Sequence, residues 1–281
     1  MLIDPYHTGW LSHLDEREAS LPSGASLILL LDGAFVPGLF RQLDDEIKPT
    51  LLFESLPSCS EETKDVSPFL VRFETSNQSL RRVLSRCSGK PMVSAIATHE
   101  SVEQLGARLA AWCIVEADGQ RFNFRFPDTR RLPAIFEALT QQQRLVLAGS
   151  AFSWTFVGRD GHWQHLPIEA APDTVEPTEQ ATLNEHQFGK LVADSEADEV
   201  WVQLLDRGIE SDLLPSQRHV LIAEALRIAD KSGLDMLMKL SWCASCIDSS
   251  GDGNDEQLLD RFALWLKEQT RNDDEAIHHT V

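Results

Sequence analysis

Apolar residues are spaced differently in the two halves of the chain. In the first half, short apolar runs with the length of buried strands alternate with stretches in which apolar residues recur every three or four positions. The strand-like runs are residues 27–31, 51–53, 69–73 and 92–97. The helical stretches are residues 39–47, 80–87, 102–112 and 132–139, and a further helix is expected from Thr140. This interleaving predicts a sheet covered by helices.

Two hairpins are predicted in the same half. Asp118-Gly119 is a strong turn pair between residues 113–116 and 121–126. In the second of these segments three phenylalanines alternate with polar residues, so the strand should have an aromatic face and a polar face, the latter formed by Arg121, Asn123 and Arg125. Residues 152–166 predict the second hairpin. The combination indicates a mixed sheet rather than a purely parallel one.

The second half of the chain reads as helical. Residues 167–181 contain three prolines and four acidic residues without apolar periodicity, which is typical of a linker. Beyond it, apolar stripes predict successive helices, the first opened by a capping box at Thr182–Glu185. We therefore predict an α/β (α+β) protein with a mixed-sheet N-terminal lobe and flanking helices (1–168), an acidic Pro-rich linker (169–181), an all-helical C-terminal lobe (182–271) and a disordered tail (272–281).

Charge separates the two lobes further. The 281-residue chain carries 44 acidic and 25 basic side chains, a net charge of −19. Residues 1–168 hold 20 acidic and 16 basic side chains, whereas residues 169–281 hold 24 and 9. Nucleic acids and anionic membranes are bound by clustered Lys and Arg, so this balance disfavours both. We expect no nucleic acid and no membrane as a partner.

The start of the chain and the cysteines indicate a cytoplasmic location. The N-terminal residues lack the charged start and apolar run of a signal peptide. The longest purely apolar run, Leu27–Leu31, is far shorter than the about 20 residues of a membrane span. The five cysteines are an odd number and mostly isolated, which is typical of a reducing compartment.

Two segments resemble metal or redox motifs but lack essential parts. Cys243 and Cys246 have the spacing of a redox pair, yet they lie near a predicted helix C-terminus, and no second Cys or His pair supplies zinc ligands. Two buried structural cysteines are the favoured interpretation. Residues 248–259 match a calcium-binding loop at several positions, but Leu259 stands where the bidentate Glu belongs. A solvated loop is favoured there, with a calcium sensor as an alternative.

Asp32 and Gly33 directly follow the buried run 27–31, where α/β enzymes often hold catalytic carboxylates. A helix-capping or turn-forming Asp is the commoner explanation. Arg125 and Asp128 are close enough in sequence to form a local structural ion pair. The chain lacks the zinc-protease, nucleophile-elbow, phosphate-loop and dinucleotide-binding patterns. We therefore expect no catalytic residue, no metal and no cofactor.

Several of these segments, in this order, resemble a known family. They are Leu29–Ala34, Leu51–Glu54, Ser67–Val71, Asp118-Gly119 with Phe122–Phe126 and Asp128, and the Trp154–Trp163 hairpin. The succession resembles the adaptor (effector chaperone) family of bacterial type VI secretion systems, whose common domain has Leu-x-Asp-Gly-Ala and Phe-Arg-Phe-x-Asp-Pro-Arg type motifs. The resemblance covers about residues 25–165. Thr129 stands where the family motif has a proline, whereas Asp128 and Arg130 match it.

The resemblance implies a non-enzymatic cytoplasmic adaptor that binds a toxic effector protein and helps load it onto the VgrG spike protein. The partner-contact or motif candidates are Asp32, Gly33, Arg121, Asn123, Arg125, Asp128 and Arg130. The acidic helical lobe is expected either to meet a basic partner surface or to keep the free adaptor soluble. The alternative hypothesis is a small hydrolase or metal-dependent enzyme that uses Asp32 at the sheet edge.

Overall fold

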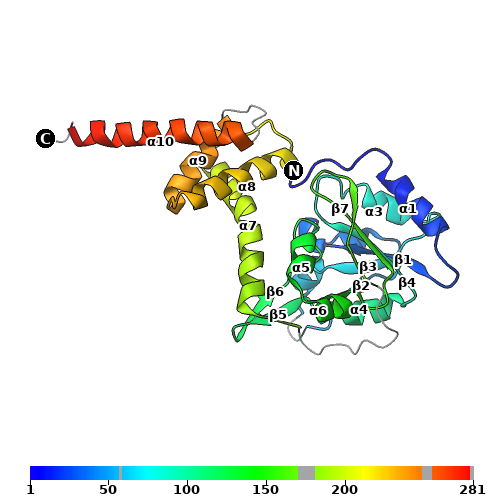
Figure 1. The fold of residues 1–281 in the computed structure, drawn as a ribbon. Coiled ribbons are helices and arrows are strands. Elements are labelled where there is room, and N and C mark those ends of the chain that lie inside the picture. Colours follow the sequence, from blue (N-terminus) through cyan, green and yellow to red (C-terminus); the bar gives the residue numbers. More distant parts are fainter. Residues whose placement is uncertain (57–58, 170–180, 249–254, 279–281) are drawn as a thin grey trace. The chain divides into compact units, whose positions relative to one another are not determined.

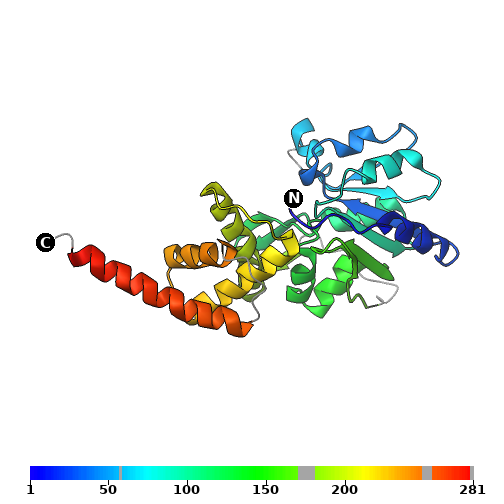
Figure 2. The same cartoon turned by 90° about the horizontal axis from the view of Figure 1, so that it is seen from above.

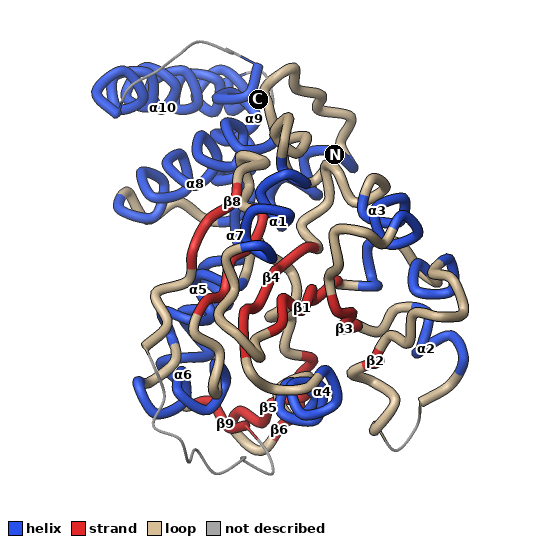
Figure 3. The backbone as a smooth tube through the Cα atoms, turned by 90° about the vertical axis from the view of Figure 1, so that its right-hand side faces the viewer, coloured by secondary structure: helices blue, strands red, loops and turns tan. Residues whose placement is uncertain are grey.

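The apolar run at 27–31 forms most of β1 (Ser26–Leu31), an interior strand of the larger sheet. The structure is a computed structural model that describes residues 1–56, 59–169, 181–248 and 255–278. Strand β1 pairs antiparallel with β3 (Phe69–Arg72) and with β4 (Val93–Thr98), and Figure 3 shows the three side by side. Successive side chains of a strand point to opposite faces, and all five residues of the run are buried because both faces of the sheet are covered.

Among the described residues, three further strands extend this sheet: β2 (Thr50–Leu51), β7 (Ser153–Val157) and β8 (Trp163–His165). The strand order is β2-β3-β1-β4-β7-β8, and every neighbouring pair is antiparallel. Figure 1 shows β1, β2, β3, β4 and β7 of this sheet together. Strands β7 and β8 form the second predicted hairpin. The prediction of that hairpin is confirmed.

A smaller sheet has the order β6-β5-β9, with strands β5 (Ile114–Ala117), β6 (Gln120–Asn123) and β9 (Ala181–Leu183). Strands β5 and β6 form the predicted hairpin, and both turn residues have positive φ, 50° at Asp118 and 70° at Gly119, as the tightest hairpin turns require. Strands β5 and β9 run parallel. The predicted fold class, α+β with a mixed sheet and a helical C-terminal region, is confirmed.

Helices cover both faces of the larger sheet. Residues of α1 (Trp10–Ala19) and α3 (Gln78–Leu84) pack with one set of sheet side chains. Residues of α4 (Val102–Ala110), α5 (Leu132–Ala138) and α6 (Gln141–Ala148) pack with the other set. In Figure 2 the cyan helix α3 and the green helices α5 and α6 lie on opposite sides of the sheet. The short elements are η1 (Gly33–Phe35), η2 (Leu39–Gln42) and α2 (Glu61–Asp65).

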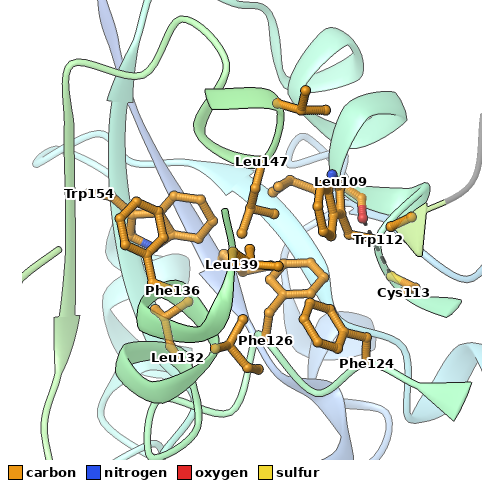
Figure 4. Close-up of a cluster of buried hydrophobic side chains, with 14 of the residues drawn as sticks. Leu109, Trp112, Cys113, Phe124, Phe126, Leu132, Phe136, Leu139, Leu147 and Trp154 are labelled. Carbon is orange, nitrogen blue, oxygen red and sulfur yellow. Dashed lines mark hydrogen bonds between the residues drawn. The ribbon is translucent and has the colours of Figure 1, made fainter. Parts of the chain in front are cut away.

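The hydrophobic core on the side of α4, α5 and α6 is rich in aromatic residues. Trp112, Phe124, Phe126 and Trp154 are buried there together with aliphatic side chains of α5 and α6 (Figure 4). Both phenylalanines, Phe124 and Phe126, come from the segment that follows β6. That segment is therefore anchored in the core although it is not part of a strand.

Two predictions about the first half are corrected, and one helix there was not predicted. The helix expected over 39–47 is only the 3₁₀ turn η2, because Leu43 is already extended. The aromatic strand expected to run to Phe126 ends at Asn123, and the Phe124 N–H makes one further hydrogen bond to the Cys113 carbonyl at 2.8 Å. Helix α1 had no sequence signal, since Leu14 is its one fully buried side chain.

Four helices follow β9 in the described residues: α7 (Glu185–Asp206), α8 (Pro215–Lys231), α9 (Met236–Asp248) and α10 (Asp255–His278). Their core contains Trp242, whose ring lies 5.1 Å from that of Phe262 and 5.5 Å from that of Trp265. The buried indole N–H of Trp242 donates a hydrogen bond to the Ala225 carbonyl at 3.1 Å.

The chain divides into two units, Met1–Asp194 and Ser195–Val281, with the boundary inside α7. Thr182 lies in β9 rather than at a helix start, and the capping box of α7 is one step later, with Asn184 and Gln187 bonded to each other at 2.9 and 3.0 Å. Residues 170–180 of the predicted linker lie outside the described residues.

Helix α10 extends to His278, in place of the disordered tail expected from residue 272, while residues 279–281 lie outside the described residues. None of the helices in the described residues combines the length and the hydropathy needed to cross a membrane.

Candidate partner-contact site

Asp32 is the residue at which β1 passes into η1. Its side chain caps the 3₁₀ helix, because Oδ1 accepts a hydrogen bond from the Ala34 N–H at 3.0 Å. Its own backbone N–H donates to the Met92 carbonyl at 3.0 Å. Only 2% of the side chain is exposed. The interpretation of Asp32 as a helix-capping residue is confirmed.

Gly33 packs closely against the backbone of Val66 and Ser67, which precede β3. A Cβ atom at this position would lie 2.3 Å from the Ser67 carbonyl oxygen, which is shorter than any normal contact. The Ser67 hydroxyl accepts a hydrogen bond from the Phe53 N–H at 3.0 Å and donates one to the Pro68 carbonyl at 2.8 Å. Three of the segments that carry the resemblance therefore meet at this point.

Arg125 reaches Asp32 from 93 residues further along the chain. The neighbouring Phe124 and Phe126 are buried in the aromatic core (Figure 4). The Arg125 side chain between them is partly exposed. Its Nη2 donates to Asp32 Oδ2 at 2.9 Å, and 41% of the arginine side chain remains exposed. The local pair expected between Arg125 and Asp128 is corrected: the partner of Arg125 is Asp32.

Asp128 pairs with Arg130. The Arg130 Nε and backbone N–H each donate to Oδ1 at 3.1 Å, and Nη2 donates to Oδ2 at 2.8 Å. The Asp128 N–H donates to the Arg125 carbonyl at 3.1 Å and forms a turn. The Thr129 N–H donates to the Pro91 carbonyl at 3.0 Å, a bond that a proline at position 129 would lack. The departure from the family motif therefore supplies a hydrogen bond in this chain.

Phe35 lies against both arginines. Its ring centroid is 5.5 Å from the guanidinium carbon of Arg125 and 5.7 Å from that of Arg130, within the range of a cation–π contact. We refer to Asp32, Phe35, Arg125, Asp128 and Arg130 as the motif cluster.

Burial dominates the electrostatics of the motif cluster. It raises the pKa of Asp32 above its ordinary value, and the Asp128 carboxylate adds to the rise, whereas Arg125 and the Ala34 N–H oppose it. A carboxyl whose pKa is raised on folding destabilises the fold while it is ionised. That destabilisation disappears as the pH falls through the folded-state pKa. The Asp32–Arg125 pair therefore fixes geometry rather than adding net stability.

The carboxylates of the motif cluster are occupied by structural contacts. Each oxygen of Asp32 and of Asp128 accepts at least one N–H. A general base or nucleophile needs an atom directed at a substrate, and these contacts give the hydrolase alternative no support. The cluster leaves part of the Arg125 side chain exposed, and Phe35 is half-buried beside it. Arginine and aromatic side chains are enriched at the centres of protein–protein interfaces.

Arg121 and Asn123 lie on β6, apart from the motif cluster. Both are exposed, with Arg121 opposite Glu116 and Asn123 opposite Ile114 in the hairpin. Strand β6 is an edge of the smaller sheet, and an edge strand can pair with a strand from another chain. The residues of the predicted polar face therefore lie in two places: Arg121 and Asn123 are on the edge strand β6, and Arg125 belongs to the motif cluster.

Three residues of this region were missed from the sequence: Phe35, Ser67 and Arg131. The Arg131 Nη1 donates to the carbonyl of Asp194 at 2.9 Å and to its Oδ2 at 3.2 Å, which ties the motif segment to α7. The position of Arg131 directly after Asp128-Thr-Arg130 is a signal that could have identified it. Ser67 had no signal beyond its place in a motif segment, and Phe35 had none beyond its position directly after the Leu29–Ala34 segment.

The other candidates are structural or lie elsewhere. Cys243 and Cys246 are buried in α9, and burial raises the pKa of each thiol to about 12. Residues 249–254 of the proposed calcium loop lie outside the described residues. Within the described ranges, no group of three or more His, Cys, Asp or Glu side chains is arranged to hold a metal ion.

Comparison with known proteins gives one match. Residues 27–145 match the profile of a family described as a domain of unknown function (DUF4123), which is less than half of the chain. The matched segment contains every residue of the motif cluster. No curated protein and no solved structure matches the chain significantly.

Proposed function

We propose that the protein is a cytoplasmic adaptor that binds an effector of a type VI secretion system and helps load it onto the VgrG spike protein. The observation that carries the proposal is the convergence of the segments that resemble that adaptor family. Asp32 and Gly33 lie against the Ser67 segment, and Arg125 pairs with Asp32 across 93 residues. The profile match over residues 27–145 covers the same segments and supports the proposal.

The motif cluster is assigned the contact with a partner protein. Its carboxylates are buried and hold the arginines, whereas 41% of Arg125 is open to solvent beside Phe35. An arginine already held by a carboxylate and an aromatic ring loses little side-chain entropy on binding. The nearby edge strand β6 offers backbone donors and acceptors for an added strand of the partner.

We assign to the second unit the contact with a partner that has a basic surface. Residues 195–281 contain 18 acidic and 8 basic side chains, a higher density of negative charge than in the first unit. Complementary charge raises the rate of encounter more than the final affinity. Association with that partner should therefore slow as salt is added.

The test is co-expression with the effector and spike proteins encoded beside it, followed by affinity capture and size-exclusion chromatography. The full-length protein should co-elute with both at modest salt. Arg125→Gln removes the partly exposed charge and should weaken capture by about tenfold, the loss of one charge-assisted hydrogen bond. If neither protein co-elutes with the unmodified chain, the adaptor proposal is wrong.

Arg72→Gln is the matched control. Arg72 is an exposed arginine on β3 of the same unit, with 59% of its side chain open to solvent and a Glu74 carboxylate 3.8 Å away. It lies outside the motif cluster, so capture should be unchanged. Equal weakening by both substitutions would reflect a general loss of positive charge and would remove the motif cluster from the interface. Circular dichroism of each variant establishes that it is folded.

A further inference from the structure

Arg17 of α1 lies across strands β7 and β8. Its Nη1 donates to the hydroxyls of Ser153 at 3.2 Å and Thr155 at 3.1 Å, and its Nε donates to His13 Nε2 at 3.1 Å. Its Nη2 lies 3.5 Å from His165 Nδ1, the longest of these contacts. None of these four partners is a carboxylate.

The positive charge of Arg17 has no counter-ion in the described part of the chain. Burial lowers the pKa of its guanidinium, and no carboxylate opposes that effect. Other half-buried arginines are neutralised, as Arg81 is by Asp15 and Arg108 by Glu100. A partly desolvated charge without a counter-ion attracts an anion, all the more when it already has a fixed orientation.

The surroundings of Arg17 suit an anion and are open on one side. His165 is exposed on β8, and His13 is half-buried and stacked on Trp163 with ring centroids 5.6 Å apart. Ser153 is half-buried, and its hydroxyl can rotate to donate a hydrogen bond. Arginine, imidazole and hydroxyl groups together are donors for the oxygens of a carboxylate or a phosphate.

We propose that Arg17, His13 and His165 form a binding site for a small oxyanion, a carboxylate or phosphate group, that contacts the guanidinium Nη2 and the His165 ring. This site is separate from the motif cluster, and it does not depend on the adaptor proposal. The anion supplies the counter-ion that Arg17 lacks. It binds beside Nη2 and the His165 ring, whose separation of 3.5 Å is the longest of the Arg17 contacts.

Binding at this site is coupled to the protonation of His13. The pKa of His13 is lowered by burial and by Arg17 and His165, and only Glu16 raises it. His13 is therefore neutral at neutral pH and accepts the Arg17 Nε–H. Strand β7 contributes only the hydroxyl groups of Ser153 and Thr155 to the contacts of Arg17. The negative charge of a bound oxyanion favours the protonated form of His13. Affinity should rise as the pH falls.

The experiment is a titration of the full chain with inorganic phosphate and, separately, with acetate, monitored by NMR of the imidazole C–H signals. Saturable shifts of the His13 and His165 signals should appear at millimolar concentrations, and the dissociation constant should be lower at about pH 6 than at about pH 8. Binding of phosphate alone indicates a phosphate ligand, and binding of both indicates that carboxylates are also accepted. Absence of saturable shifts with either anion overturns the proposal.

Substitutions test the residues. Arg17→Gln should weaken binding by at least about tenfold, and His165→Gln, at an exposed position, should weaken it to a similar degree. Arg17→Lys keeps the charge and should restore part of the affinity lost in Arg17→Gln. Arg72→Gln is the matched control and should bind as the unmodified chain does. Equal binding by Arg17→Gln and the unmodified chain overturns the proposal.

Discussion

Substitution of Gly33 by alanine tests the packing on which the motif cluster depends. The added Cβ atom would lie 2.3 Å from the Ser67 carbonyl oxygen, 3.1 Å from the Ser67 carbonyl carbon and 3.2 Å from the Val66 carbonyl carbon. All three are backbone atoms, so no side chain can rotate away to make room. Either η1 or the segment that enters β3 must move.

The expected loss follows from this geometry. Overpacking a core costs about 1–3 kcal/mol, and a clash with backbone places Gly33→Ala near the upper end, at about 3 kcal/mol. In a unit of the size of Met1–Asp194, each kcal/mol corresponds to about 2–4 °C in Tm, so the transition should fall by roughly 6–12 °C. Scanning calorimetry measures this, because it resolves separate transitions of the two units.

Gly189→Ala is the matched control with the opposite expected sign. Gly189 lies inside α7, and a Cβ atom there would meet nothing within 4 Å. Replacing a helical glycine by alanine stabilises by about 0.5–1 kcal/mol. If Gly33→Ala changes the free energy of unfolding by less than about 0.5 kcal/mol, the contact between η1 and the Ser67 segment is looser than described, and the packing argument fails.

Three further predictions concern the thiols, a buried phenol and the acidic unit. Cys243 and Cys246, with pKa values raised to about 12 by burial, should resist a thiol reagent at neutral pH in the native protein, whereas half-buried Cys59 reacts; rapid native labelling of either helix cysteine would contradict this. Burial also raises the pKa of Tyr6, whose hydroxyl donates to the Lys90 carbonyl at 2.7 Å, so its stabilisation should be complete below the unfolded pKa of about 10 and should be lost as the pH rises through the higher folded value. If the stability of Tyr6→Phe falls at alkaline pH as much as that of the unmodified chain does, another group is responsible for the loss. Association of the acidic second unit with a basic partner should slow between about 0.1 and 1 M salt, where the Debye length falls from about 10 to 3 Å; a rate independent of salt would mean that the acidity serves only solubility.

The elements that could be predicted from the sequence are those whose stabilising contacts are local. The capping box at the start of α4 is such a local contact, with the Ser101 hydroxyl accepting the Gln104 N–H at 3.2 Å and the Gln104 side chain accepting the Ser101 N–H at 2.9 Å. The Asp118-Gly119 turn has the positive φ angles that this residue pair favours. Both signals depend on residues within a few positions of each other.

The helix expected over 39–47 shows where apolar spacing misleads. Leu39 and Leu43 are both buried in the core, as a helical face would place them. However, Leu43 is extended, with ψ of 147°, and the Asp44 N–H donates to the Ser79 hydroxyl at 3.1 Å instead of to a helical carbonyl. A loop that is held by a distant side chain can bury the same positions as a helix, so the spacing alone does not separate the two.

The partner of Arg125 is the clearest case in which only the tertiary structure decides. Sequence proximity favours Asp128, and the pair would have been local. Burial of both Phe124 and Phe126 sets the direction of Arg125, while Asp128 is already bound by Arg130 on both carboxylate oxygens. Arg125 is thereby left to the carboxylate that caps η1, Asp32. None of these residues is informative by itself, because Asp-Gly, Phe-Arg-Phe and Asp-x-Arg are common combinations. Their order along the chain is informative because the fold requires each segment to meet the others at the end of β1.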